Sequence, residues 1–260
     1  MKQVLDLSIT DMLVSLSLVL AALVVSLRHG LALERTILWG VLRTVVQLAA
    51  VGYLVHAIFA LDHPLPVMGL LIVMLLVAAW TATSRQPFAR LPLYPLTLAS
   101  LAFGAGVVIF LVVVVIVGAR PWYDPRYMIP LGGMILGNAM NSTALGLERL
   151  ERELRQGRRR VEAVLALGGS PAQAGAEAER QSIRAALIPM LNSMMVVGLV
   201  QLPGLMTGQI LAGVDPLVAV RYQVLVMFML LAGNALSTGV AVRHTRNRYF
   251  TAAWQLELPR

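Results

Sequence analysis

A polar stripe runs along one of the apolar segments of this 260-residue chain. Met134, Asn138 and Asn141 stand at positions i, i+4 and i+7, which places all three on one face of a helix. Amides in a membrane commonly form hydrogen bonds between helices, and thioethers fill gaps in the packing. The same side chains can also form a neutral, oxygen-bearing lining for a small polar or cationic substrate, so both interpretations stay open. Other apolar segments carry further candidates for such a path: Gln47, Met190, Asn192, Met194, Gln201, Gln209, Gln223 and Asn234.

Residues suited to metal binding or catalysis are few. Asp62 and His63 could form a weak metal site at the exit of a transport path, and a solvated loop also explains the pair. The four histidines lack the i,i+4 spacing of a helical zinc site, and the chain has no cysteine. Iron(II) prefers nitrogen and oxygen ligands, and the sequence contains no evident high-affinity iron cage. We therefore expect no catalytic residues. The alternative of a different class is an intramembrane hydrolase, which would be active without any ATPase.

The composition is that of a polytopic membrane protein. The chain is 58% hydrophobic and 13% charged, whereas soluble domains contain about 25% charged residues. Several apolar runs are long enough to cross a hydrocarbon core of about 30 Å as helices. We predict an all-α fold forming a single transmembrane domain over residues 1–260, and a proline-glycine pair at 203–204 could break its sixth span. The seven predicted spans are 8–27, 37–61, 67–83, 96–117, 128–147, 187–210 and 217–242.

The arginines predict how these spans are oriented. With the N-terminus outside, the outer side receives only Lys2, Arg120 and Arg126, and the inner side receives the other cationic side chains of the loops. This arrangement satisfies the positive-inside rule in every loop, so we predict an N-out, C-in topology. Membrane orientation also accounts for the net charge of +8 without a nucleic-acid partner.

The longest polar stretch, residues 148–182, is predicted to be a cytoplasmic coupling segment between spans five and six. It begins as a charged extension of span five with favourably oriented ion pairs, Glu148–Arg152 and Glu151–Arg155. A short amphipathic helix follows, with an apolar face formed by Val161, Val164, Leu165 and Gly168. Gly168 and Gly169 end this helix, and a capping box of Ser170, Pro171 and Gln173 begins another. The apolar face suits a groove on a protein partner, with the lipid headgroups as the alternative.

The energy source for transport is predicted to lie outside this chain. Its only lysine is Lys2, so it cannot contain a Walker A loop, which needs a lysine before a helix. The carboxylates all fall in loops or at span ends, whereas carriers driven by an ion gradient commonly keep titratable groups near the membrane midplane. We therefore expect no cofactor in this chain, with ATP and magnesium held by a partner subunit.

Part of the coupling segment resembles a known signature. The stretch EAVLALGGSP resembles the EAA signature of ABC-transporter membrane subunits. The Glu-Ala pair, the Gly and the Pro of that signature correspond to Glu162, Ala163, Gly168 and Pro171. The chain departs from the signature at Val164, which replaces the second Ala. The chain is also similar to the FetB family in stretches outside this segment. These stretches are LALERTILWGVLRTVVQL, MILGNAMN, SIRAALIPMLNSMMVVGLVQLPGLMTGQILAGVDP and the RYQ that follows it. That family comprises membrane subunits of a bacterial iron exporter and of plant aluminium-tolerance transporters.

The resemblance implies a function and a set of partners. It implies a homodimeric permease, multi-pass in the inner (plasma) membrane and in contact with its lipid, that works with a separate ATPase subunit. Its substrate would be a metal ion, most simply iron, with another small solute such as a sugar nucleotide as the alternative. The residues that would couple to the ATPase are Glu162, Ala163, Leu165, Gly168, Gly169 and Pro171.

Overall fold

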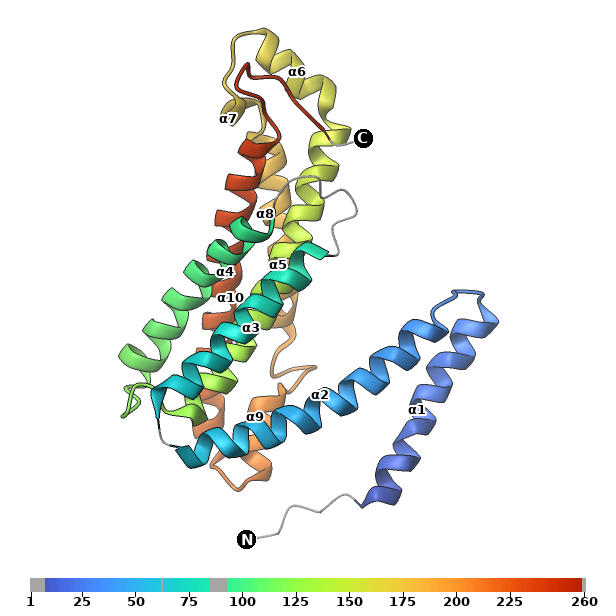
Figure 1. Cartoon of the computed structure of the whole chain (residues 1–260), viewed down its shortest axis with the longest axis vertical. Helices are drawn as coiled ribbons and strands as arrows, with labels where there is room; N and C mark the ends of the chain where they lie inside the picture. Colours follow the sequence, from blue (N-terminus) through green and yellow to red (C-terminus); the bar gives the residue numbers. More distant parts are fainter. Residues whose placement is uncertain (1–7, 62, 85–92, 259–260) are drawn as a thin grey trace. The chain divides into compact units, whose positions relative to one another are not determined.

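The computed structural model describes residues 8–61, 63–84 and 93–258, and these residues are helical except for short connections. The chain divides into two compact units, Met1–Asp62 with Leu211–Gly213, and His63–Ile210 with Val214–Arg260. Figure 1 gives the helix labels used below.

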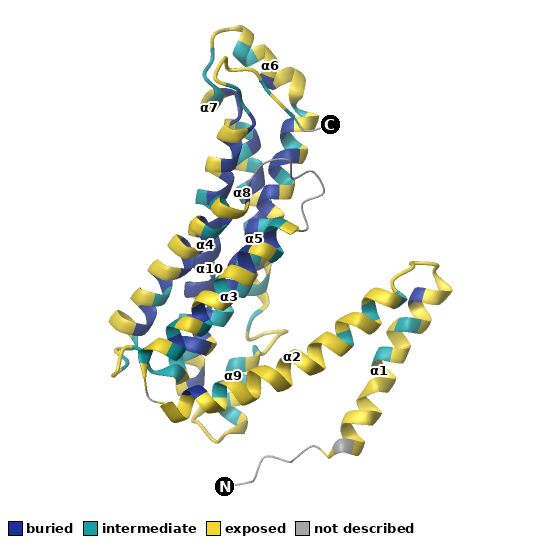
Figure 2. Ribbon diagram, viewed as in Figure 1, coloured by how far each residue is buried: buried dark blue, intermediate teal, exposed yellow. Residues whose placement is uncertain are grey.

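The first unit is a pair of apolar helices, α1 (Ile9–Arg28) and α2 (Glu34–Leu61). Ser8 caps α1 by accepting a hydrogen bond from the backbone N–H of Asp11, and the Asp11 carboxylate accepts one from Ser8 in return. The turn between the helices is fixed by Ser26, which donates to Glu34 Oε1 over 2.6 Å. Almost all side chains of both helices are exposed (Figure 2), as suits apolar helices that contact lipid.

The second unit is a bundle of long helices. It contains α3 (Pro64–Ser84), α4 (Leu93–Phe110) with its π-helical continuation η1 (Leu111–Ile116), α5 (Pro125–Gln156), α8 (Ala176–Val196) and α10 (Pro216–Arg248). α10 packs along α5, α4 and α8, and α5 also packs against α3. The buried side chains therefore concentrate on α5 and α10 (Figure 2).

Proline and aspartate residues define where the two central helices begin. Asp124 accepts a hydrogen bond from the backbone N–H of Arg126 at the start of α5, and Asp215 accepts one from Leu217 at the start of α10. In each helix a proline follows the capping aspartate, in the first-turn position that it tolerates best. With 32 residues, α5 is about 48 Å long, which is more than the thickness of a hydrocarbon core of about 30 Å.

Five of the helices in the described part of the chain are long and apolar enough to cross a membrane: α1, α2, α3, α4 with η1, and α10. These five correspond to five of the seven predicted spans. α5 and α8 do not meet the same criterion, since α5 carries the amide stripe and α8 begins in the charged segment. The polytopic character is confirmed, and the count of seven stays a prediction.

The predicted sixth span, 187–210, is broken, and the break begins earlier than the proline-glycine pair at 203–204 at which it was considered possible. α8 ends at Val196, and the short helix α9 (Gly204–Leu211) starts eight residues later. Gly198 adopts a φ of +82°, a left-handed conformation that L side chains rarely adopt, and this turns the chain out of the helix. The break therefore precedes Pro203, which sits just before α9.

Candidate functional site

A polar cavity of about 230 Å³ lies between α5, α8 and α10, near the middle of the two longest helices. Asn141 is 16 residues from the start of α5, and Asn234 is 18 residues from the start of α10, so both stand about 25 Å along their helices. The walls combine amides, hydroxyls and apolar groups: Asn138, Asn141, Ser142, Leu145, Ala186, Pro189, Met190, Ser193 and Asn234. None of these nine residues carries a charge.

Asn234 is the most deeply buried amide of the cavity wall. Its side chain is 4% exposed, and its Oδ1 atom is buried without a hydrogen-bond partner among the described residues. Leaving a buried carbonyl oxygen unpaired costs about 1–3 kcal/mol, so such an atom in a native fold calls for an explanation. Asn234 is one of the residues that line the cavity, so a ligand there could supply the missing partner once the side chain turns its oxygen toward it.

The amide of Asn138 is partly committed to its own helix. Its Nδ2 donates to the carbonyl oxygen of Met134 over 2.9 Å, which ties the amide nitrogen to the backbone one turn earlier. The Oδ1 atom then remains to accept a bond or to coordinate a ligand. Met134 itself does not line the cavity and serves here through its backbone.

Hydroxyl groups beside the cavity are used to join the three helices. Ser142 Oγ donates to the carbonyl oxygen of Ala186 on α8 over 3.2 Å, and it accepts from Thr238 Oγ1 on α10 over 3.0 Å. Thr143 lies 3.5 Å from the same Thr238 hydroxyl. These groups satisfy one another, so they hold the helices in register and leave the amides as the groups open to a ligand.

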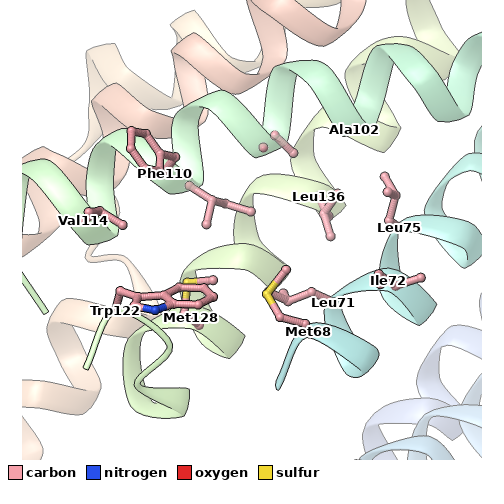
Figure 3. Close-up of a pocket in the computed structure, with 13 residues that line it drawn as sticks. Met68, Leu71, Ile72, Leu75, Ala102, Phe110, Val114, Trp122, Met128 and Leu136 are labelled. Atoms are coloured by element: carbon pink, nitrogen blue, oxygen red, sulfur yellow. The ribbon is translucent and has the colours of Figure 1, made fainter. Parts of the chain in front are cut away.

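A second, larger space lies between α3, α4 and α5 and is apolar throughout. Its volume is about 280 Å³, and Figure 3 shows its carbon and sulfur lining, with the indole nitrogen of Trp122 at one end. Met68, Leu71 and Leu136 form part of its walls. Polar chemistry for a solute is therefore concentrated in the amide cavity and not here.

The coupling segment forms the helix–turn–helix that the sequence predicted. α6 (Arg158–Ala166) is followed by a turn in which Gly168 has a φ of +83°, and then by the single turn α7 (Pro171–Ala174). Ser170 and Gln173 form the predicted capping box, with Ser170 Oγ accepting from the Gln173 backbone N–H. Both predicted ion pairs on the extension of α5 are present, Glu148–Arg152 at 2.5 Å and Glu151–Arg155 at 2.9 Å.

The apolar face of α6 packs inside this chain, so the expectation that it faces a partner is wrong. Val161 is 4% exposed and belongs to a cluster with Leu150 and Leu154 of α5. Val164 and Leu165 pack against the same cluster. The cause is the C-terminal segment after α10, which folds back beside α6 and α7 (Figure 1) and adds Tyr249, Phe250, Leu256 and Leu258 to the cluster.

Two buried polar contacts tie the end of α10 to this cluster. Arg246, which is 7% exposed, forms an ion pair with Glu179 at the start of α8. The Tyr249 hydroxyl pairs with Glu151 of α5, and burial together with the negative charge of Glu151 raises the pKa of the Tyr249 phenol well above its ordinary value. The coupling segment is therefore built onto α5, α8 and α10 together.

The exposed side of α6 is left as a surface. Arg159, Glu162, Ala163 and Ala166 are exposed on the helix, and Leu167 at its end is 89% exposed. Among the predicted coupling residues, Gly168 is exposed, whereas Gly169 and Pro171 are half-buried. Arg158 pairs with Glu162 across one turn over 2.7 Å.

Only some of the residues predicted for the substrate path line the amide cavity. Asn138, Asn141 and Met190 line the cavity, together with Asn234. The other candidates do not line the cavity: Met194 stands one turn beyond Met190 on α8, Asn192 is exposed on another face of that helix, Gln201 is in the irregular stretch after it, Gln209 is on α9, Gln223 is earlier on α10, and Gln47 is on α2 in the other unit. Of the proposed metal pair, Asp62 lies outside the described residues, and His63 Nδ1 accepts from the Leu65 backbone N–H.

Sequence reasoning missed the contacts that depend on residues far apart in the chain. Glu179 and Arg246 are 67 residues apart, and no local spacing links them. Ser142 and Ser193 carry no signal of their own beside the amides. Their only detectable hint is position, since each stands one helical turn from a residue that was singled out: Asn138 and Met190, respectively.

Comparisons with known proteins agree with the membrane architecture. The family model described as "Uncharacterised protein family (UPF0014)" matches residues 9–250. A UPF0014 membrane protein of Synechocystis is 44% identical, over 93% of each chain. The probable iron export permease protein FetB of Escherichia coli is 37% identical over 93% of this chain and 92% of its own length. The protein ALUMINUM SENSITIVE 3 of Arabidopsis thaliana is 33% identical over 94% and 88%. No solved structure matches the chain.

Proposed function

Because the chain belongs to the UPF0014 family of membrane proteins, we propose that it is the membrane-spanning permease subunit of an ABC transporter. The observation that carries this proposal is the coupling segment, a short helix, turn and capped helix fixed to the ends of three long helices. A segment that merely floats on headgroups needs no such anchoring, whereas a segment that receives force from a motor does.

The surface that meets the motor is the outward face of α6. Arg159, Ala163 and Ala166 follow the i, i+4, i+7 spacing, lie opposite the buried Val161 and are all exposed. We call these three residues the docking stripe. Its two alanines let another protein approach the helix closely, and Glu162 beside the stripe supplies a charge for recognition. Of the EAA-like residues, Glu162 and Ala163 thus belong to the contact, whereas Leu165 supports α6 from behind.

Force applied to the docking stripe has a route into the membrane. α6 rests on Leu150 and Leu154, so it moves with α5. The Glu179–Arg246 ion pair links α8 with α10 at the same end. All three helices that border the amide cavity therefore converge on the coupling segment, and a displacement of that segment would change the cavity.

The proposed substrate rests on the name of a relative, and the proposed orientation in the membrane rests on the distribution of arginines along the chain. The FetB relative is named as a probable iron export permease, which supports export of iron as the transport reaction. ATP and magnesium would be bound by a separate subunit, since the single lysine of this chain stands at position 2. We further propose a homodimer with seven spans in the inner membrane, N-terminus out and C-terminus in, with the coupling segment in the cytoplasm.

Co-purification tests the proposed docking directly. Ala163→Arg places a long cation in the docking stripe, and it should reduce the recovery of a Walker-containing ATPase with the tagged permease at least about tenfold. The matched control is Ala252→Arg, which adds the same charge at an exposed position of the C-terminal segment and should leave recovery unchanged. Equal recovery with both variants, or no such ATPase with the wild-type chain, would refute the proposal.

A further inference from the structure

The amide cavity has the features of a ligand site and not only of a helix contact. Asn234 lines the cavity, and its Oδ1 is buried without a hydrogen-bond partner in the described part of the chain. The Oγ of Ser237, one turn later, is also buried and unpaired, but among the residues with such an atom only Asn234 lines this cavity. If the amides served only to join helices, the Asn234 oxygen would be expected to have a partner. The side chain is 4% exposed, so bulk solvent does not satisfy it either.

The groups open to a ligand are neutral oxygens. Asn138 has its amide nitrogen bound to the Met134 carbonyl, which leaves its Oδ1 atom available. Asn141 is exposed on the next turn of the same face. Asn234, on α10, contributes an unpaired Oδ1 that is buried and would have to turn toward the cavity to reach a ligand. Amide carbonyl oxygens are ligands for hard cations, and Met190 adds a soft thioether on the same wall.

The charge of the lining discriminates between classes of substrate. A sugar nucleotide carries a negatively charged diphosphate, which proteins bind with arginine, lysine or helix N-termini. None of the nine lining residues is cationic, so the cavity offers a diphosphate no compensation. A small cation can exchange water for amide oxygens, and the absence of a carboxylate from the lining keeps such binding weak enough for release.

We propose that this cavity is the transit site of a small metal cation, coordinated by the amide oxygens of Asn138, Asn141 and Asn234. The inference deepens the proposed function, since it rests on the chain being a permease, and it names the class of substrate and the atoms that receive it. A weak neutral site near the middle of α5 and α10 suits a cation that must enter, pause and leave.

The experiment measures equilibrium binding of Fe²⁺ to the purified full chain in lipid nanodiscs, under anaerobic reducing conditions. Asn141→Asp places a carboxylate on the cavity wall at an exposed position, and the Kd for Fe²⁺ should fall roughly tenfold. The matched control, Asn192→Asp, makes the same change on an exposed face of α8 that does not line the cavity, and it should leave the Kd unchanged. Asn234→Leu should abolish binding.

These binding measurements decide whether the amide cavity is the cation site. No Fe²⁺ binding to any variant, an unchanged or higher Kd for Asn141→Asp, or equal tightening by both aspartates would overturn the cavity as the cation site. If Asn234→Leu fails to fold, the two aspartate variants still decide. Transport is scored separately, in vesicles that contain the chain and its ATPase. The expected binding pattern without ATP-driven Fe²⁺ transport would refute the proposed function and leave the cation site standing.

Discussion

At the scale of single residues, two buried polar side chains of the α10 segment differ in how they are satisfied. Asn234 has a buried oxygen with no partner in the described chain, whereas Tyr249 is engaged by Glu151. Burying either polar group costs free energy, and only for Tyr249 does a hydrogen bond within the fold offset that cost. We attribute the unpaired Asn234 oxygen to the ligand proposed for the cavity, whereas Tyr249 stabilises the end of the bundle that carries the coupling segment.

Tyr249→Phe is expected to lower the free energy of unfolding by about 1.5–3 kcal/mol near neutral pH, because it removes a hydrogen bond to a buried carboxylate. The variant also tests pH dependence. Burial, followed by the charge of Glu151, raises the pKa of Tyr249 above the ordinary value of about 10. The neutral phenol therefore stabilises the fold below about pH 10, and this contribution is lost as the pH rises through and beyond that value.

The measurement is thermal unfolding of the purified chain at about pH 8 and about pH 10.5, on either side of the ordinary phenol pKa. The Tm of the wild-type chain should fall more between the two pH values than that of Tyr249→Phe. Equal falls in both proteins would show that Tyr249 does not carry the effect.

At the scale of elements, the contact surfaces of α10 are set by small residues on its neighbours. A Cβ added at Gly104 of α4 would lie 2.6 Å from the backbone nitrogen of Ser237, and one at Gly146 of α5 would lie 2.7 Å from Thr238 Cγ2. These glycines allow the close packing that the hydroxyl network around Ser142 needs. By contrast, a Cβ at Gly204 or Gly208, which form a small-xxx-small pattern in the sequence, meets nothing within 4 Å in the described chain.

Gly104→Ala should therefore destabilise the bundle by about 1–3 kcal/mol, since the obstacle is backbone and cannot rotate away. Gly106→Ala on the same helix is the matched control, because its Cβ meets nothing within 4 Å. The control should be neutral or more stable by up to about 1 kcal/mol through its higher helix propensity. The two Tm values in one detergent decide the comparison, and a similar loss in both variants would contradict the packing of α4 against α10.

At the scale of the whole molecule, the sequence predicted the helices and their caps better than it predicted what each face contacts. Five spans and the coupling helix–turn–helix follow from apolar length, from Gly168 and from the Ser170 cap, all of which act locally. A break of the sixth span was considered only at 203–204, and its start after Val196 was missed because the residues around Gly198 remain apolar, so hydropathy does not register the turn. The direction of the α6 apolar face was missed because it depends on Tyr249, about 90 residues further along the chain.

The candidate site could be predicted only in part, because spacing along one helix is local whereas the contacts between helices are not. The stripe of Asn138 and Asn141 is a property of one helix and can be read from spacing. Their meeting with Met190 and Asn234 depends on how α5, α8 and α10 pack, which periodicity does not specify. The amides that do not reach the cavity, such as Gln223 and Asn192, have the same composition signal in the sequence.

The absence of cysteine makes the proposed topology directly testable, since single cysteines can be added to an otherwise unreactive chain. Ala172→Cys lies at an exposed position of α7, and Ala212→Cys lies at an exposed position between α9 and α10. In intact cells an impermeant maleimide should label the second and not the first, and permeabilised cells should label both. Labelling of Ala172→Cys from outside would overturn the predicted orientation.

The central claim is that this chain conducts a cation only when a separate ATPase acts on its coupling segment. The most direct measurement is ⁵⁵Fe²⁺ accumulation in inverted vesicles containing the chain alone, the chain with its co-purified ATPase, or the Ala163→Arg variant with that ATPase. We predict ATP-dependent accumulation with the wild-type pair only. Accumulation by the chain alone, or transport by the variant equal to that of the wild-type pair, would contradict the account.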